Sequence, residues 1–270
     1  IHSCFPNLHP LFPNIPYTHA WRGGARGLQC IANRLPYKTI YKEPITFDAI
    51  LGWESNNKIP ILFSFRRCPY AIRARIAIKL CDLECEIREI NLKLKNKEFL
   101  KISPKGTVPV LVLPDDKIIE ESIDIVHWAI KTNDPYNLKL DNPNKYNEDI
   151  ELIRIFDCEF KYHLDRYKYD TRFKDAKREE HKYKARDLLV NLNDRLEEKK
   201  WLNGDNISLS DISILPFIRQ YRIADIKWFD EQLELPNINR WLDNFLNSKI
   251  LNNVMKKYTI WETTDPKIFL

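Results

Sequence analysis

The chain has 270 residues, of which 44% are hydrophobic and 30% are charged, and its formal net charge at pH 7 is +5. These proportions are typical of a soluble protein of one or two domains, and no stretch approaches the roughly 18 consecutive apolar residues that a membrane-spanning helix needs. Because positive and negative side chains are interleaved, the composition favours neither a nucleic acid nor a membrane as a partner.

The six cysteines are scattered along the chain, and no Cys-x-x-Cys pair occurs. No charged-then-apolar signal segment opens the chain, so a reducing, cytoplasmic location without disulfides is expected. Cys81 and Cys85 have no matching second pair of ligands, so no metal site is expected there.

The first 57 residues differ from the rest in composition. They hold six of the sixteen prolines and four of the six glycines, and they show little sustained periodicity. The chain begins at Ile1, and its only methionine is Met255. We therefore expect residues 1–57 to be a disordered or non-native N-terminal extension without a functional role. An accessory segment that packs on the surface is the alternative.

An α/β pattern occupies residues 58–133. We expect strands at 59–65, 86–90, 108–113 and 117–120, and helices at 69–82, 95–102 and 122–132. The turn between the last two strands is so short that they form an antiparallel hairpin. The order βαβαββα therefore predicts a sheet with a parallel half and an antiparallel half, covered by helices.

The remainder of the chain has helical spacing. Residues 134–147 are rich in turn-forming residues and are expected to be a linker, and residues 148–262 are expected to form an all-α domain. Ser208 and Asp211 have the spacing of a capping box at the start of a helix. Pro216 lies inside that helix and should kink it.

Cys68 is the candidate catalytic residue. It lies between a strand-like segment and a helix-like segment, with Pro69 at the first helical position. Free backbone N–H groups and the helix dipole favour a thiolate there, so we expect its pKa to lie below the roughly 8.5 of a free cysteine. A buried structural cysteine is the alternative. The neighbouring arginines are expected to be mostly surface charge without specific contacts: Arg66, Arg67, Arg73 and Arg75.

The motifs together resemble the glutathione S-transferase superfamily over about residues 58–258. Its fold has a thioredoxin-like domain followed by an all-helical domain. Thr107 to Leu111 looks like the Val-Pro turn of that family, with a cis proline, and Glu121-Ser122 looks like its γ-glutamyl-binding pair. Cys-Pro-Tyr at the first helix and the segment from Asn91 to Lys97 are similar to the Omega class, whose members reduce disulfides, glutathione mixed disulfides and dehydroascorbate.

This resemblance implies that glutathione is the co-substrate and that the protein is a homodimer. Ala71 stands where a second thiol would lie, which implies a monothiol thioltransferase mechanism in which glutathione resolves a mixed disulfide on the protein. The implied site is Cys68 as the nucleophile, Glu121 for the ammonium and Ser122 for the carboxylate of the γ-glutamyl group, Val108 and Pro109 for the cysteinyl part, Lys95 for the glycyl carboxylate, and Tyr70 as a further contact.

Several alternatives stay open at this point. The fold also serves as a non-catalytic protein-interaction module, and the same thiol could conjugate glutathione to small electrophiles. Glu121 and Ser122 could form an ordinary helix N-terminus, and Lys95 could be a solvated lysine. The physiological second substrate follows from no motif.

Overall fold

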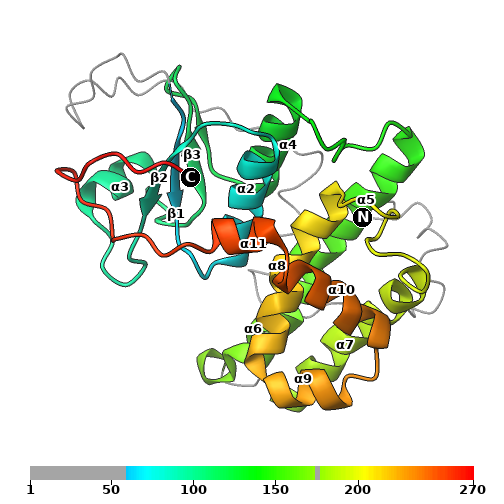
Figure 1. Cartoon of the computed structure of the whole chain (residues 1–270). Coiled ribbons are helices and arrows are strands. Elements are labelled where there is room, and N and C mark those ends of the chain that lie inside the picture. Colours follow the sequence, from blue (N-terminus) through cyan, green and yellow to red (C-terminus); the bar gives the residue numbers. More distant parts are fainter. Residues whose placement is uncertain (1–58, 174–176) are drawn as a thin grey trace, which may run out of the picture.

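The computed structural model describes residues 59–173 and 177–270. The N-terminal extension expected at residues 1–57 lies outside these described residues. An α/β domain comes first and a helical domain follows, which confirms the predicted fold class. Figure 1 shows the sheet and the first helices on one side of the molecule and the long helices of the second domain on the other.

The sheet has four strands in the order β2-β1-β3-β4. Strand β1 runs parallel to β2 and antiparallel to β3, and β3 and β4 form the predicted hairpin. The strands in both halves of the sheet therefore run in the predicted directions. Each strand is shorter than the range predicted for it from the sequence. Their bounds are Ile61–Ser64 for β1, Glu86–Glu89 for β2, Val110–Val112 for β3 and Ile118–Ile119 for β4.

Helices cover both faces of this sheet. On one face, helices α2 (Pro69–Leu80) and α4 (Ser122–Thr132) pack on an apolar cluster that includes Leu62 and Leu111. On the other face, the short helix α3 (Lys97–Ile102) packs on a cluster that contains Phe63. Alternate residues of β1 thus point to opposite faces, as expected for a strand buried on both sides.

The second domain is helical and its apolar stripes form one core that continues to α2. Helix α5 begins at Pro143, inside the range predicted as a linker, because Asn142 caps it by accepting from the N–H groups of Asn144 and Lys145. The helical elements are α5 (Pro143–Ile155), the π-helical segment η2 (Phe156–Phe160), α6 (Lys161–Lys168), the short η3 (Asp170–Arg172), α7 (Arg178–Arg195), α8 (Leu209–Ala224), α9 (Ile226–Gln232), α10 (Pro236–Leu246) and α11 (Lys249–Val254).

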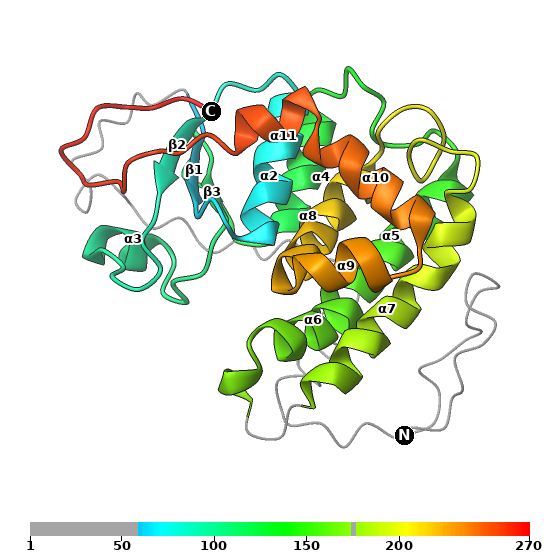
Figure 2. The ribbon, with the colours of Figure 1, turned by 60° about the horizontal axis from the view of Figure 1, so that its bottom comes forward.

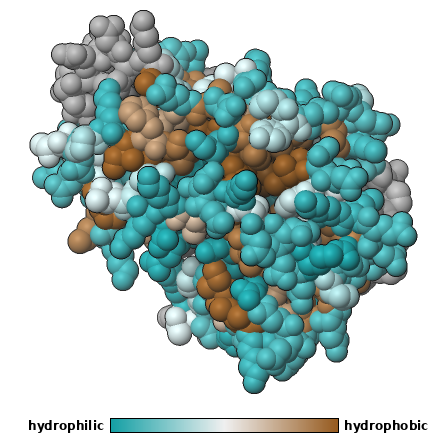
Figure 3. Space-filling model, viewed as in Figure 1, coloured by the Kyte–Doolittle hydropathy of each residue, from teal (hydrophilic) through white to brown (hydrophobic). Residues whose placement is uncertain are grey.

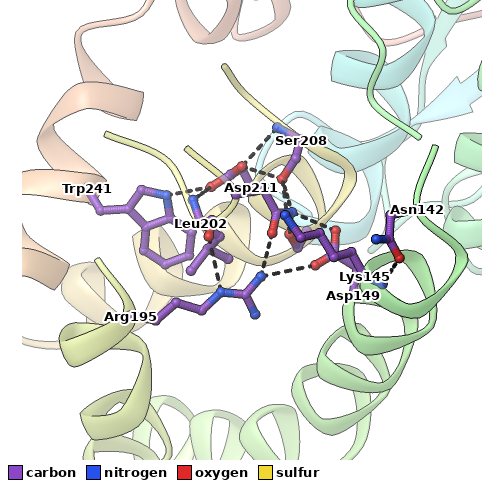
Figure 4. A network of polar contacts seen from close by, with 10 residues as sticks. Asn142, Lys145, Asp149, Arg195, Leu202, Ser208, Asp211 and Trp241 are labelled. Carbon is purple, nitrogen blue, oxygen red and sulfur yellow. Dashed lines mark hydrogen bonds and ion pairs between the residues drawn. The ribbon is translucent and has the colours of Figure 1, made fainter. Parts of the chain in front are cut away.

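Asp211 organises the interior of this domain (Figure 4). The predicted capping box with Ser208 forms at the start of α8. The Asp211 carboxylate accepts from the Ser208 N–H at 2.9 Å, from the Leu202 N–H at 2.9 Å and from the Trp241 indole at 2.8 Å. Burial nevertheless raises the pKa of Asp211 to about 6, which these hydrogen bonds only partly oppose.

The C-terminal segment returns to the first domain, which differs from the predicted helical range of 148–262. After α11, Ile260 and Phe269 form bridges with the edge strand β2, and Trp261 packs edge-on against Phe63. The Trp261 N–H donates to the Glu89 carbonyl at 2.8 Å. This segment therefore covers a strand edge that would otherwise be open. Figures 1 and 2 both show it beside β2.

The surface has mixed polarity. On the face drawn in Figure 3, polar residues cover most of the area and apolar residues gather in separate patches. None of the helices in residues 59–173 and 177–270 has both the length and the apolar character that crossing a membrane requires.

Candidate active site

Cys68 is the N-cap residue of α2. Its backbone is extended, with φ −77° and ψ 122°, and Pro69 takes the first helical position as predicted. A turn follows β1, in which the Cys68 N–H donates to the Phe65 carbonyl at 2.9 Å. The Cys68 carbonyl then accepts the first helical hydrogen bond, from Ile72, also at 2.9 Å. The strand, the turn and the helix therefore fix the position of the thiol.

The thiol faces the Val-Pro turn. The Val108–Pro109 peptide bond is cis, as the resemblance implied. The Cys68 Sγ lies 3.6 Å from the Val108 carbonyl oxygen and donates to it. Two parts of the predicted site that are 40 residues apart in the sequence are thereby in contact.

The titration of Cys68 differs from the prediction. Burial raises the pKa of its thiol, and this effect outweighs the backbone N–H groups of Ala71 and Tyr70 and the charges of Lys161 and Arg73, all of which lower it. The helix N-terminus acts in the predicted direction, but the sequence did not reveal how far the packing around the part-buried Cys68 removes its sulfur from water. The expectation of a pKa below that of a free cysteine is therefore wrong for the described structure.

Glu121 and Ser122 begin helix α4. Glu121 is the exposed N-cap residue, and Ser122 is buried, with 4% of its surface exposed. The Ser122 Oγ accepts a hydrogen bond from the Arg73 guanidinium at 3.2 Å. Because a guanidinium only donates, the hydroxyl hydrogen of Ser122 stays available to donate to a carboxylate.

Arg73 is buried at the contact between the two domains, which corrects the expectation that it is surface charge. It makes two hydrogen bonds with the Asp157 carboxylate, at 3.0 and 2.6 Å. It also donates to the Ser213 carbonyl in α8, at 3.1 and 2.7 Å. The guanidinium therefore joins the start of α4 to two elements of the helical domain. In the sequence, the acidic Asp157 lies within the apolar stripe of α5 and η2. This was the one sequence signal that pointed to a buried basic partner.

Arg75 is also buried, and the surface expectation is wrong here too. It pairs with Glu89 of β2 and donates to the Ser64 hydroxyl at 2.7 Å and to the Val254 carbonyl at 3.0 Å. Glu89 in turn accepts from the backbone N–H of Arg66 at 2.6 Å. These contacts hold the turn before Cys68 against the sheet. Helix α2 is covered by α4, α8 and α11, which is why arginines on it are enclosed.

Lys95 is exposed and lies against the loop that leads to the Val-Pro turn. Gly106 has φ +60°, and a Cβ added there would come within 2.8 Å of the Lys95 Cδ and Nζ. Glycine at this position therefore permits both the left-handed backbone and the close approach of the lysine. The structure brings Lys95 near Gly106, and a contact with a glycyl carboxylate stays a prediction.

Tyr70 follows Pro69 in α2, and its ring faces the helical domain. The ring packs edge-to-face on Phe217 with centroids 4.9 Å apart, and the Arg73 guanidinium lies 5.6 Å from its centroid. The Lys161 Nζ lies 5.8 Å from the same ring. Tyr70 therefore adjoins Cys68 and the α6 side of the site, and its contact with glutathione stays a prediction.

Metal-binding geometry does not occur among the described residues: none of their His, Cys, Asp and Glu side chains form a group of three or more that could hold an ion. The four cysteines described here, Cys68, Cys81, Cys85 and Cys158, are free thiols.

Comparison with known proteins finds two family matches. Residues 62–136 match the family "Glutathione S-transferase, N-terminal domain", and residues 155–249 match "Glutathione S-transferase, C-terminal domain". "Glutathione S-transferase omega-1" of Mus musculus is 25% identical over 186 residues, which are 67% of this chain and 74% of the relative. "Probable glutathione S-transferase DHAR1, cytosolic" of Oryza sativa subsp. japonica is 29% identical over 161 residues, which are 58% of this chain and 68% of the relative.

Solved structures share the fold. A crystal structure of a glutathione transferase family member from Pseudomonas fluorescens, with two glutathione bound, has a TM-score of 0.67 and 18% sequence identity. The alignment covers 78% of this chain and 99% of that chain.

Proposed function

Because the chain belongs to the glutathione S-transferase superfamily and is Omega-like, we propose that it is a glutathione-dependent thiol transferase with Cys68 as its nucleophile. The observation that carries this proposal is the free thiol at the N-cap of α2, 3.6 Å from the carbonyl of the Val-Pro turn. A thiol forms and breaks disulfide bonds, whereas a hydroxyl at this position would only support activation of glutathione.

Glutathione is the co-substrate, and we assign its contacts as follows. Ser122 donates its hydroxyl hydrogen to the γ-glutamyl carboxylate, with the N-terminus of α4 behind it, and the exposed carboxylate of Glu121 meets the ammonium. The backbone of Val108 pairs with the cysteinyl part, and Lys95 meets the glycyl carboxylate. This pose directs the glutathione sulfur toward Cys68.

The reaction has two exchange steps. The Cys68 thiolate attacks the glutathionyl sulfur of a mixed disulfide, forming a disulfide between Cys68 and glutathione and releasing the other half as a thiolate, which takes up a proton. A second glutathione, as thiolate, attacks this disulfide, releases glutathione disulfide and restores the Cys68 thiolate. In sum, one mixed disulfide and one glutathione give one thiol and one glutathione disulfide, and no second protein thiol takes part.

The raised pKa of Cys68 limits the thiolate at neutral pH. The N–H groups of Tyr70 and Ala71 and the charge of Lys161 stabilise the thiolate in part. Deprotonation therefore precedes attack, and the rate rises as the thiol titrates.

The relatives support a substrate range rather than one substrate. The resemblance to the Omega class, with a relative named omega-1, supports glutathione mixed disulfides and dehydroascorbate-type compounds as this range. By the same analogy we propose that the protein acts in the cytoplasm and as a homodimer.

The test is turnover of the full 270-residue chain with a glutathione mixed disulfide, glutathione, NADPH and glutathione reductase. The Cys68→Ala variant should lose the protein-dependent rate. Cys158→Ala is the matched control, because it removes another partly buried thiol and should retain the rate. Equal rates for the native chain and Cys68→Ala would reject the proposed function.

A further inference from the structure

Five basic residues lie on α6, on α8 and in the turn before Cys68. Lys161 and Lys168 lie on α6, Arg219 lies on α8, and Arg66 and Arg67 belong to the turn. We refer to these five residues as the basic cluster. Its members come from both domains, so only the folded chain brings them together.

The packing of α6 against α8 brings Lys168 and Arg219 to the same part of the molecule, and charges of the basic cluster act on one another there. Burial, together with the charges of Arg219, Arg67 and Lys161, lowers the pKa of Lys168 to about 8, against an opposing effect of Asp165. Burial and the charge of Arg66 likewise lower the pKa of Arg219. Near the end of α6, the Gln220 amide of α8 donates to the Tyr169 hydroxyl at 3.1 Å, which holds the two helices side by side there.

The basic cluster adjoins the thiol. Arg67 immediately precedes Cys68 in the chain, and its guanidinium lies 5.3 Å from the Phe65 ring centroid. Lys161 lies 5.8 Å from the ring of Tyr70, two residues after Cys68, and its charge acts on the Cys68 thiol. A group bound among these cations would therefore lie next to the sulfur.

Little negative charge balances the basic cluster. Lys161 pairs with Asp165 one helical turn along α6. In the part of the chain that the structure describes, Lys168, Arg219 and Arg67 form no ion pair with a carboxylate. Holding like charges together in a partly buried place costs free energy, and a bound anion would remove that cost.

We propose that the basic cluster is the binding site for an anionic, carboxylate-bearing half of the second substrate, so that the preferred substrates are small acidic disulfides. This inference rests on the proposed function, because it names the substrate class of the same thiol. The carboxylate lies among Lys168, Arg219 and Arg67, and the sulfur of this acidic half is bonded to the glutathionyl sulfur that Cys68 attacks. When that disulfide bond breaks, the acidic half leaves as a thiolate, and the same cations stabilise this second negative charge.

The first test needs neither glutathione nor turnover. Iodoacetate and iodoacetamide alkylate a thiol in the same way, but only iodoacetate is an anion. The ratio of their rates at Cys68, followed by mass spectrometry of the Cys68 peptide, reports the local potential. We expect this ratio to exceed that of free glutathione by about tenfold and to fall by a similar factor in Lys168→Gln/Arg219→Gln.

Lys227→Gln is the matched control, because Lys227 is an exposed lysine of the same domain on α9. It should leave the alkylation ratio unchanged. A ratio equal to that of free glutathione in the native chain, or an equal ratio in the native chain and the double variant, would overturn the proposal.

The second test uses turnover with three mixed disulfides of glutathione, whose other halves are mercaptopropionate, mercaptoethanol and cysteamine. These halves are anionic, neutral and cationic. Since their intrinsic reactivities differ, the quantity compared is the ratio of kcat/KM for the anionic and cationic substrates in the native chain and in Lys168→Gln/Arg219→Gln. We expect this ratio to fall at least about fivefold in the double variant.

The outcomes separate the two proposals. Turnover that depends on Cys68 with an unchanged charge ratio would refute the anionic site and leave the proposed function standing. No turnover with any of the disulfides, together with a high iodoacetate preference that the double variant abolishes, would refute the thioltransferase and support an anion site beside Cys68.

Discussion

The contact between Arg73 and Asp157 should be the strongest single polar link between the two domains. Their side chains are 0% and 3% exposed, and two hydrogen bonds join them. The change Arg73→Met removes the cation and leaves a buried carboxylate without its partner. A loss of about 3–5 kcal/mol in the free energy of unfolding is expected for such a change.

A double-mutant cycle isolates the pair. Asp157→Leu alone leaves a buried guanidinium with fewer acceptors, whereas Arg73→Met/Asp157→Leu replaces both charges by apolar groups. The double variant should therefore be destabilised by about 2–3 kcal/mol less than the sum of the single variants. Urea unfolding, monitored by circular dichroism, measures the free energy of unfolding of the two single variants and the double variant relative to the native chain.

The exposed pair Arg154–Glu151 on α5 is the matched control. It also has two hydrogen bonds, at 2.9 and 2.6 Å, but its side chains are 41% and 45% exposed. Its coupling free energy should stay below about 1 kcal/mol. Additive effects of Arg73→Met and Asp157→Leu, within about 0.5 kcal/mol, would refute the view that burial makes the interdomain pair strongly coupled.

Three further predictions concern titration and binding. Burial raises the pKa of folded Asp211 to about 6, above the roughly 3.9 of an unfolded chain, so its contribution to stability falls as pH rises from about 4 to about 6. The difference in unfolding free energy between the native chain and Asp211→Asn should therefore shrink by up to about 3 kcal/mol over that range, and a constant difference would contradict this. Because burial raises the pKa of the Cys68 thiol, its alkylation by iodoacetamide should still increase with pH beyond 9, and a plateau near neutral pH would be inconsistent with it. Ser122→Ala should weaken glutathione binding about tenfold by calorimetry, and unchanged affinity would remove Ser122 from the site.

The fold could be predicted from the sequence because its signals are local. Alternating apolar runs, helical stripes and the Ser208–Asp211 spacing each depend on a few neighbouring residues, and the structure contains all of them. The return of the C-terminal segment to β2 could not be predicted, because an edge strand accepts any extended segment of suitable reach and Trp261 follows no repeating pattern.

The candidate site was predicted in part for the same reason. Cys68-Pro69 and Val108-Pro109 are short motifs, and the structure brings the thiol and the Val108 carbonyl together. The pKa of Cys68 and the burial of Arg73 depend on how the second domain covers α2, which involves contacts between residues up to 140 positions apart. Local sequence showed the helix N-terminus that favours a thiolate, but it did not show the burial that opposes it.

The central claim is that Cys68 carries a glutathionyl group during turnover. The most direct test exposes the full chain to a glutathione mixed disulfide without free glutathione and maps the product by mass spectrometry. The account predicts one glutathionyl group, located on Cys68, which free glutathione then removes. Turnover without an adduct at Cys68, or an adduct found only at Cys158, would contradict it.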